Sequence, residues 1–250
     1  MKHDTLRAYG NILAFIVMVA VNSLSSTLPL NGKTDKELSD AYNLLITPAG
    51  YVFSIWGMIY IMLAIWCIYQ VLPRHRSDDV FRSISFWFIL NALLNAAWIF
   101  VWHYQWVDAS ILIMYGLLAT LIIIYNVTRK TTTSFWLVVP FSIYIGWVSV
   151  AAIVNTQTVF VYHGWDQLNV SGITVALITL LLATVLAFYV TSRTRDIFYS
   201  LVFIWAFIGI GVRQSEFHDI TLAVIVVTIA LFSSVIYALY RKKGTFQIYR

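Results

Sequence analysis

The chain has 250 residues, of which 60% are hydrophobic and 11% are charged, and its net charge is +5. A typical soluble domain has about 25% charged residues, so this chain has too little polar surface to cover itself in water. The composition therefore excludes a soluble globular domain and indicates an integral membrane protein whose main partner is lipid.

Eight apolar stretches are long enough to cross a bilayer, which takes about 20 residues in a helix. None alternates apolar and polar residues as the strands of a membrane β-barrel do, so helices are expected. The seventh stretch is the shortest, and it contains Gly209 and Gly211 just before Arg213. We predict an all-α, polytopic membrane protein with helices over residues 8–28, 48–72, 80–102, 107–128, 135–155, 172–190, 197–212 and 220–240.

The start of the second helix has a local signal. The longest polar stretch, residues 31–43, separates the first two apolar stretches and is followed by Thr47 and Pro48. Threonine is a good N-cap and proline fits the first helical turn. The sequence therefore predicts that the second helix starts at Pro48.

The distribution of basic residues predicts the topology. On one side of the eight predicted helices lie only Lys33, Lys36 and Arg213, so the other thirteen of the sixteen lysines and arginines lie on the opposite side. Basic residues favour the cytoplasmic side, so we expect a multi-pass cell-membrane protein with both termini in the cytoplasm. The net positive charge then reflects topology and attraction to anionic lipid, and no nucleic-acid partner is expected.

The sequence has no pattern for metal binding or hydrolytic chemistry. Its five histidines are scattered, and its one cysteine, Cys67, lies in an apolar stretch where it is expected to be buried and inert. The predicted helices also lack a pair of groups for general acid–base catalysis. We expect no metal site and assign no catalytic residue from these patterns, although enzymatic activity stays open.

Aromatic and amide side chains share faces of two predicted helices. In the second helix, Phe53, Trp56 and Tyr60 are spaced i, i+3 and i+7, which places them on one face. In the third helix, Asn95 and Trp98 lie on one face, in a stripe that also holds Asn91 and Trp102. Asparagine in a membrane helix needs a polar partner, so this stripe is expected to face protein or a cavity.

The fifth predicted helix has a similar stripe of Trp147, Ala151 and Asn155, spaced four residues apart. A cavity lined by such stripes would suit a flat, amphipathic ligand. The alternative is purely structural: tryptophans anchor helices at membrane interfaces, as expected for Trp136, and asparagines join helices by hydrogen bonds.

Three motifs resemble those of the TspO/MBR family, the tryptophan-rich sensory proteins and translocator proteins. Residues 47–53, TPAGYVF, followed by Trp56, are similar to the family's TPPxWVF…W signature, with alanine in place of its second proline. Residues 94–98, LNAAW, resemble its third-helix LNxxW motif. Residues 147–151, WVSVA, followed by Asn155, resemble its fifth-helix motif.

The resemblance implies a five-helix transmembrane bundle over residues 1–165, to which residues 166–250 add about three helices. It also implies binding of porphyrin, haem or another tetrapyrrole between the helices, and it leaves a homodimer open. The family is associated with light-dependent porphyrin breakdown, which would involve Trp56 and Trp147. By motif and stripe position, the expected ligand-binding residues are Tyr51, Phe53, Trp56, Tyr60, Asn95, Trp98, Trp147, Ala151 and Asn155.

These observations leave three functions to compare. The first is a TspO-like sensor or regulator that binds a tetrapyrrole. The second is a transporter for a small solute, lipid or sterol that uses the three added helices, and the third is a structural membrane subunit. A transporter needs polar or charged groups near the middle of the membrane, and the last three predicted helices contain no carboxylate or lysine there. The sequence therefore favours the sensor, with helices six to eight outside its pocket.

Overall fold

The computed structural model describes residues 2–27, 30–33, 35–165 and 171–243. The predicted end of the first helix at residue 28, the predicted division after residue 165 and the C-terminus at residue 250 fall on or beside residues outside these ranges. The described elements are α1 (Lys2–Thr27), η1 (Leu30–Gly32), α2 (Asp35–Ala41), η2 (Gly50–Ser54), α3 (Ile55–Val71), α4 (Asp79–His103), α5 (Val107–Thr131), α6 (Phe135–Tyr162), α7 (Gly172–Thr194), α8 (Ile197–Arg213) and α9 (His218–Lys243).

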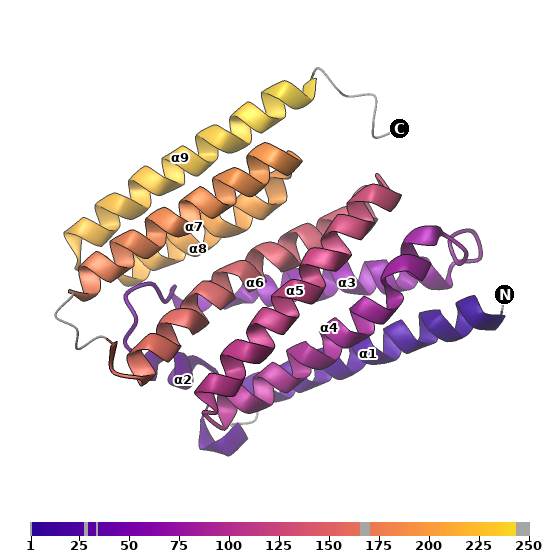
Figure 1. Ribbon diagram of the computed structural model, residues 1–250, viewed down its shortest axis with the longest axis horizontal. Helices are drawn as coiled ribbons and strands as arrows, with labels where there is room; N and C mark the ends of the chain where they lie inside the picture. Colours follow the sequence, from indigo (N-terminus) through magenta and orange to yellow (C-terminus); the bar gives the residue numbers. More distant parts are fainter. Residues whose placement is uncertain (1, 28–29, 34, 166–170, 244–250) are drawn as a thin grey trace.

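The predicted all-α membrane fold is confirmed. Seven helical stretches are long and apolar enough to span a membrane, and α8 is a shorter apolar helix of 17 residues. At about 1.5 Å per residue, α8 reaches ~25 Å, close to the ~30 Å of a bilayer core. The start of α1 and the end of α9 lie toward the same end of the molecule, as an even number of crossings requires (Figure 1).

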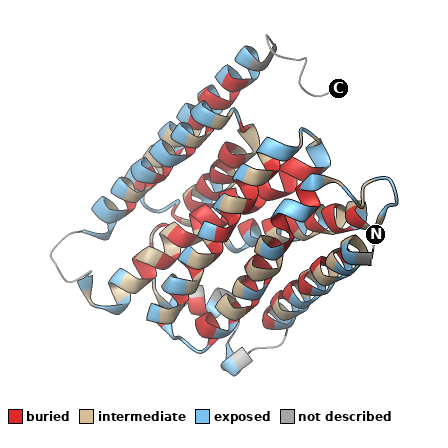
Figure 2. Ribbon diagram, turned by 45° about the vertical axis from the view of Figure 1, so that its right-hand side comes forward, coloured by how far each residue is buried: buried red, intermediate tan, exposed pale blue. Residues whose placement is uncertain are grey.

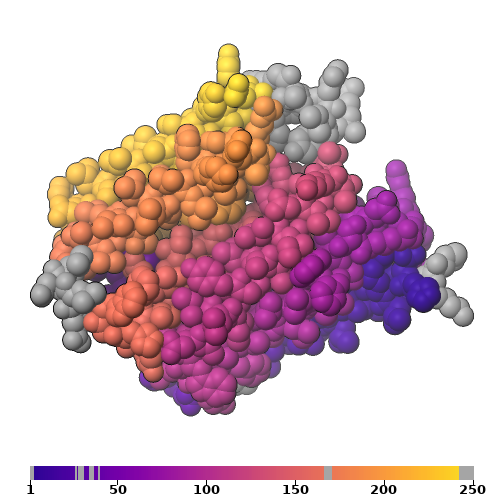
Figure 3. All heavy atoms as spheres, viewed as in Figure 1, coloured from indigo at the N-terminus to yellow at the C-terminus, as the bar shows by residue number. Residues whose placement is uncertain are grey.

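The helices form two groups. Helices α1 and α3–α6, the five-helix part, pack together, and α7–α9, the three-helix part, lie on one side of them (Figure 1). The space-filling view shows α7 and α9 over one side of the molecule and α1, α4 and α5 over the other (Figure 3). Within the three-helix part, α8 makes the main contact with the five-helix part, through α6.

Helix α6 is the central element. In an apolar stretch of 18 residues in α6, 83% of the residues are buried, against 22% and 28% in the corresponding stretches of α7 and α9. The burial colours in Figure 2 show the same contrast. Gly146 lets α8 approach closely, because a Cβ atom there would lie 3.1 Å from Cβ of Val202. Beside it, the Tyr199 hydroxyl donates to Oγ of Ser149 at 2.9 Å. Small residues at a membrane helix interface allow this kind of contact.

The junction between α7 and α8 forms a second connection between the three-helix part and the five-helix part. The buried carboxylate of Asp196 accepts hydrogen bonds from the N–H groups of Phe198 and Tyr199 and so caps α8. It also accepts a hydrogen bond of 2.9 Å from the Tyr125 hydroxyl of α5, and Arg129 lies 3.6 Å away. This carboxylate therefore joins the start of α8 to α5.

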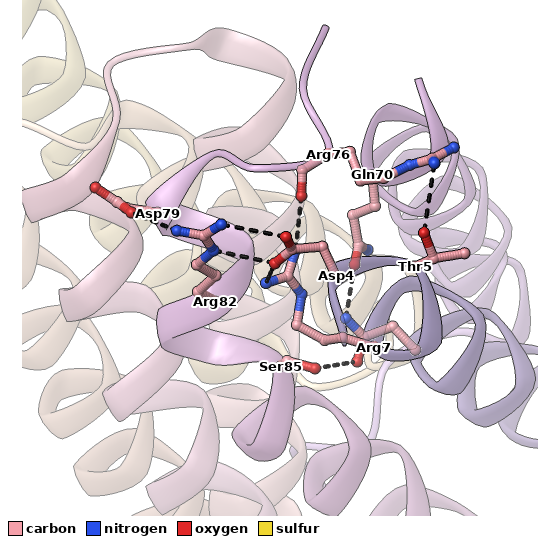
Figure 4. Close-up of polar contacts among 9 residues, drawn as sticks. Asp4, Thr5, Arg7, Gln70, Arg76, Asp79, Arg82 and Ser85 are labelled. Carbon is pink, nitrogen blue, oxygen red and sulfur yellow. Dashed lines mark hydrogen bonds and ion pairs between the residues drawn. The ribbon is translucent and has the colours of Figure 1, made fainter. Parts of the chain in front are cut away.

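A second polar cluster joins α1, α3 and α4 at the end where α1 begins (Figure 4). Asp4 accepts a hydrogen bond of 3.0 Å from Arg7 and two from Arg82, at 3.0 and 3.2 Å. Two turns further into the bundle, Nδ2 of Asn11 donates to Oε1 of Gln70 at 2.6 Å. The cluster fixes these three helices at the end of the bundle that lies opposite α2 (Figures 1 and 4).

The predicted start of the second membrane helix is wrong in detail. That helix begins as the 3₁₀ turn η2 at Gly50 and becomes α-helical at Ile55, and Thr47 caps neither segment. Ala49 has an extended backbone, with ψ of 148°, and its N–H donates to the carbonyl of Gly209 in α8 instead of continuing a helix. The polar stretch before it also contains the short helix α2, which the sequence did not indicate.

Candidate ligand-binding cavity

The five-helix part contains a cavity of about 580 Å³. Such a volume falls in the range of about 300–1,000 Å³ that is typical of small-molecule sites. The lining side chains come from the last turns of α1, residues 47–53 (the lip segment), and α3–α6. The cavity therefore occupies the half of the bundle toward the ends of α1 and α4, away from the charged cluster of Asp4.

Eight of the nine predicted site residues line this cavity, and Tyr51 does not. The Tyr51 side chain is 46% exposed and meets the Trp205 ring edge-on at 5.4 Å between centroids. It was assigned to the site because its motif position matched, but η2 turns it toward α8. The eight lining residues are Phe53, Trp56, Tyr60, Asn95, Trp98, Trp147, Ala151 and Asn155.

An aromatic cluster from η2, α3 and α6 forms one wall. Trp56 stacks on Tyr60 with ring centroids 5.5 Å apart and an interplanar angle of 21°. The Trp147 ring stands nearly perpendicular to both Trp56, at 6.4 Å, and Phe53, at 5.8 Å. Edge-to-face and offset contacts of this kind hold aromatic rings in fixed positions and leave ring faces for a ligand.

A chain of hydrogen bonds fixes a further part of the wall, and its Tyr144 ring contacts Trp56 of the aromatic cluster at 5.8 Å. The Asn95 side chain accepts a hydrogen bond from Nδ2 of Asn22 at 2.7 Å and donates to the Tyr144 hydroxyl at 2.9 Å. All three side chains are buried, and they come from α4, α1 and α6. Because buried amides are held by good partners, this network sets the relative positions of the three helices around the cavity.

A second amide group lies toward the end of α6. Nδ2 of Asn155 donates to Oγ of Ser110 at 3.0 Å, and Oδ1 of Asn155 accepts from Nε1 of Trp98 at 3.4 Å. Trp98 stacks on Trp102 at 5.4 Å with an angle of 13°. Outside the membrane-spanning helices, Tyr42 covers Trp102 at 5.9 Å, and burial raises the pKa of this tyrosine. The near-parallel rings of Trp98 and Trp102 therefore form this part of the wall, and the tilted ring of Tyr42 packs behind them.

A family model described as TSPO-like protein matches residues 8–237. The chain belongs to the TSPO-like protein family. The match begins in α1 and ends in α9, so it covers both the five-helix part and most of the three-helix part. No curated protein and no solved structure matches the chain.

Two residues of the cavity lining in this TSPO-like chain carry buried polar groups without partners. Nε1 of Trp147 and Oγ1 of Thr47 have no hydrogen-bond partner among the described residues, and their residues are 3% and 1% exposed. Both residues line the cavity. A buried polar group without a partner costs about 1–3 kcal/mol. Both atoms are shielded within the wall, so a ligand would reach them only if these side chains turned toward the cavity.

Sequence reasoning missed several lining residues of this TSPO-like chain. Asn22 had a usable signal, because an amide inside an apolar stretch needs a partner. The sequence predicts a helix cap at Thr47 and gives no pattern for Tyr144, which does not line the cavity but holds Asn95 there. Their roles depend on how distant helices converge, which spacing along one helix does not reveal.

Beyond the cavity, an aromatic cluster fills the bundle on the side of the charged cluster. Trp66 lies 4.6 Å from Phe88, 5.3 Å from Phe141 and 5.5 Å from Phe81 between ring centroids, and these four side chains are almost fully buried. The lining of the cavity itself contains no charged side chain among the described residues. The TSPO-like cavity is thus apolar and aromatic, with a few fixed amide and hydroxyl groups.

Proposed function

We propose that this TSPO-like membrane protein is a receptor with a sensory or regulatory role that binds a flat, amphipathic ligand of the tetrapyrrole class, such as a porphyrin or haem. The observation that carries the proposal is the cavity of about 580 Å³, whose walls hold stacked and edge-to-face aromatic rings together with amide and hydroxyl groups. A planar macrocycle offers large faces for stacking and ring or edge atoms that can hydrogen-bond to these groups.

The lining also favours particular contacts to such a ligand. It contains no Lys or Arg among the described residues, so carboxylate groups would stay at the opening instead of entering the apolar interior. It contains no histidine or cysteine either, and these are common axial ligands of haem iron. We therefore expect ring stacking to dominate, with similar affinity for a metal-free porphyrin and its zinc complex.

The transporter and structural hypotheses have less support. The described residues of α7–α9 contribute no side chain to the cavity lining, so the added helices do not extend it into a path. The buried cluster around Trp66 occupies the bundle between the cavity and the Asp4 end. A purely structural subunit would not require a cavity of this size, since protein interiors are close-packed with few large voids.

An absorbance titration of the purified protein with a porphyrin panel tests the proposal. We expect saturable binding with one porphyrin per chain, a changed porphyrin spectrum and quenching of tryptophan fluorescence. A linear detergent-like amphiphile of similar hydrophobicity should compete poorly. Absence of saturable porphyrin binding, or equal displacement by the linear amphiphile, would contradict a site for flat tetrapyrroles.

A further inference from the structure

One face of α8 lies against the lip segment. Trp205, Gly209 and Arg213 are spaced four residues apart, so they form a single stripe along the helix. The stripe faces residues 40–52, which connect α2 to α3. Four residues of the lip segment, Thr47, Pro48, Gly50 and Phe53, line the cavity on its other side.

Each member of this stripe makes a specific contact. The carbonyl of Gly209 accepts a hydrogen bond from the N–H of Ala49 at 3.0 Å. Nε1 of Trp205 donates to the carbonyl of Val52 at 3.0 Å. These two bonds join a side chain and a main-chain group of α8 to the backbone of the lip segment just before and within its 3₁₀ turn.

The third contact lies at the end of α8. Arg213 forms an ion pair of 2.6 Å with Asp40, at the end of α2. Arg213 is one of the three basic residues that the positive-inside pattern leaves on the less basic side of the molecule. The ion pair with Asp40 accounts for a basic residue on that side of the molecule.

The absence of a side chain at Gly209 is required by this contact. A Cβ atom at Gly209 would lie 2.1 Å from Cγ2 of Val52 and 3.2 Å from Cβ of Pro48. Val52 is fully buried, so it has little room to move away. Even one added methyl group must therefore displace the lip segment or α8.

We propose that the Trp205–Gly209–Arg213 stripe holds the lip segment in the conformation that lines the cavity, which makes α8 a positioning element for ligand binding. The three-helix part thus controls the affinity of a cavity that it does not line. The effect on affinity rests on the proposed tetrapyrrole-binding function, whereas the effect on the lip segment does not.

The Gly209→Ala variant tests this role. Hydrogen exchange of the full-length protein in lipid nanodiscs should become faster in residues 47–53, because the bond from the Ala49 N–H is lost or lengthened. Zinc protoporphyrin affinity should fall about fivefold or more, since the walls at Pro48 and Phe53 shift. Trp205→Phe, which keeps the ring but removes the donor to Val52, should change both readouts in the same direction and by less.

Gly211→Ala is the matched control. It adds the same methyl group to the same helix, but toward Val224 of α9, where the Cβ atom would lie 3.0 Å from Cγ1. Both substitutions raise helix propensity equally, so this term cancels in the comparison. Gly211→Ala should leave exchange in the lip segment and porphyrin affinity at wild-type values.

A complementary double variant distinguishes a specific effect on the position of the lip segment from a nonspecific loss of stability. Val52→Ala removes the methyl group that Gly209→Ala would strike, so the double variant should recover slow exchange in residues 47–53 and most of the affinity. The proposal is overturned if Gly209→Ala leaves lip exchange unchanged, if the double variant is no better than Gly209→Ala, or if the lip loosens while porphyrin affinity stays the same. If wild type binds no porphyrin, the proposed function fails, and lip exchange still decides whether α8 holds the segment.

Discussion

The five-helix part and the three-helix part are both apolar enough for a membrane, but they use polar side chains differently. In the five-helix part, amides such as Asn22 and Asn95 hydrogen-bond across helices. In the three-helix part, hydroxyls often bond within their own helix, as Thr184 does to the carbonyl of Leu180 at 2.6 Å and Ser233 to a carbonyl four residues before it. The amides fix helices around a cavity, and the hydroxyls leave α7 and α9 able to face lipid.

The physical reason for this difference is the number of hydrogen-bonding groups. An asparagine side chain has two donors and an acceptor, and a carbonyl of its own helix can pair only with a donor, so a buried asparagine such as Asn22 also bonds to a neighbouring helix. A serine or threonine hydroxyl is satisfied by the carbonyl one turn earlier. The region rich in amides and tryptophan therefore builds the site, and the region whose helices have mainly hydroxyls as polar groups supports it from outside, through the contacts of α8.

The prediction with the largest expected effect concerns the membrane topology of the two parts. Five crossings would place the chain on opposite sides of the membrane before α1 and after α6, and three more crossings return it to the starting side. A reporter fused after residue 250 should be cytoplasmic, and one inserted at residue 36 should face the other side. If both report the same side, α7–α9 do not cross the membrane as proposed.

A block inside the cavity should have the next largest effect. Ala151 lines the cavity in the middle of α6, so Ala151→Phe places a ring where the ligand is proposed to bind. We expect porphyrin affinity to fall by about tenfold or more, equivalent to ~1.4 kcal/mol or more. Isothermal titration or absorbance titration measures this change.

The matched control puts the same residue on the other region. Ala230 is exposed on α9, where a phenylalanine faces lipid. Ala230→Phe should leave porphyrin affinity unchanged. Equal affinity loss in both variants would show that the cavity is not the binding site.

Substitution of either tryptophan of the Trp56–Trp147 pair should have a moderate effect on porphyrin affinity. Trp56→Phe and Trp147→Phe keep an aromatic ring but reduce the stacking surface, and Trp147→Phe also removes the unpaired indole N–H. Aromatic contacts are worth about 0.5–1.5 kcal/mol, so affinity should fall roughly 2- to 12-fold in a fluorescence or absorbance titration. Trp136→Phe, at an exposed position at the start of α6, serves as the control. Unchanged affinity in both cavity variants would mean that these rings only pack.

Sequence reasoning predicted the fold well because membrane helices depend on length and apolarity. It placed the seven long helical stretches and the shorter α8, but it ended α6 at Asn155, whereas the helix continues to Tyr162. The hydroxyls of Thr156 and Thr158 bond to carbonyls four residues earlier, so polar residues there do not stop the helix. Periodicity alone treats such residues as a boundary.

The candidate site was predictable where side chains share a helical face. The stripes of Trp56 with Tyr60 and of Trp147 with Asn155 follow from spacing and do reach one cavity. Tyr51 was assigned from its position in a motif, and its direction depends on a 3₁₀ turn held by α8. The contact of Gly209 with Val52 joins residues 157 positions apart, and no local pattern reports it.

The smallest expected effect concerns two asparagines one turn apart in α4. Asn91 donates to Oγ1 of Thr120 at 2.8 Å and to the carbonyl of Leu117 at 3.1 Å, and it does not line the cavity. When Asn91→Leu removes these bonds, Thr120 still donates to Leu117 at 2.8 Å. The variant should lose only about 0.6 kcal/mol of stability, the average for interhelical hydrogen bonds in membranes, and bind porphyrin as wild type does.

Asn95→Leu is the matched comparison, since the same exchange removes the partner of both Asn22 and Tyr144 at the cavity wall. Leaving buried polar groups unpaired costs about 1–3 kcal/mol each, so this variant should be clearly less stable in a denaturation series and bind porphyrin more weakly. The two asparagines would then differ because one joins helices and the other also shapes a cavity. Equal losses of stability and affinity in the two variants would remove that distinction, and Asn95 would have to be regarded as a helix-joining residue like Asn91.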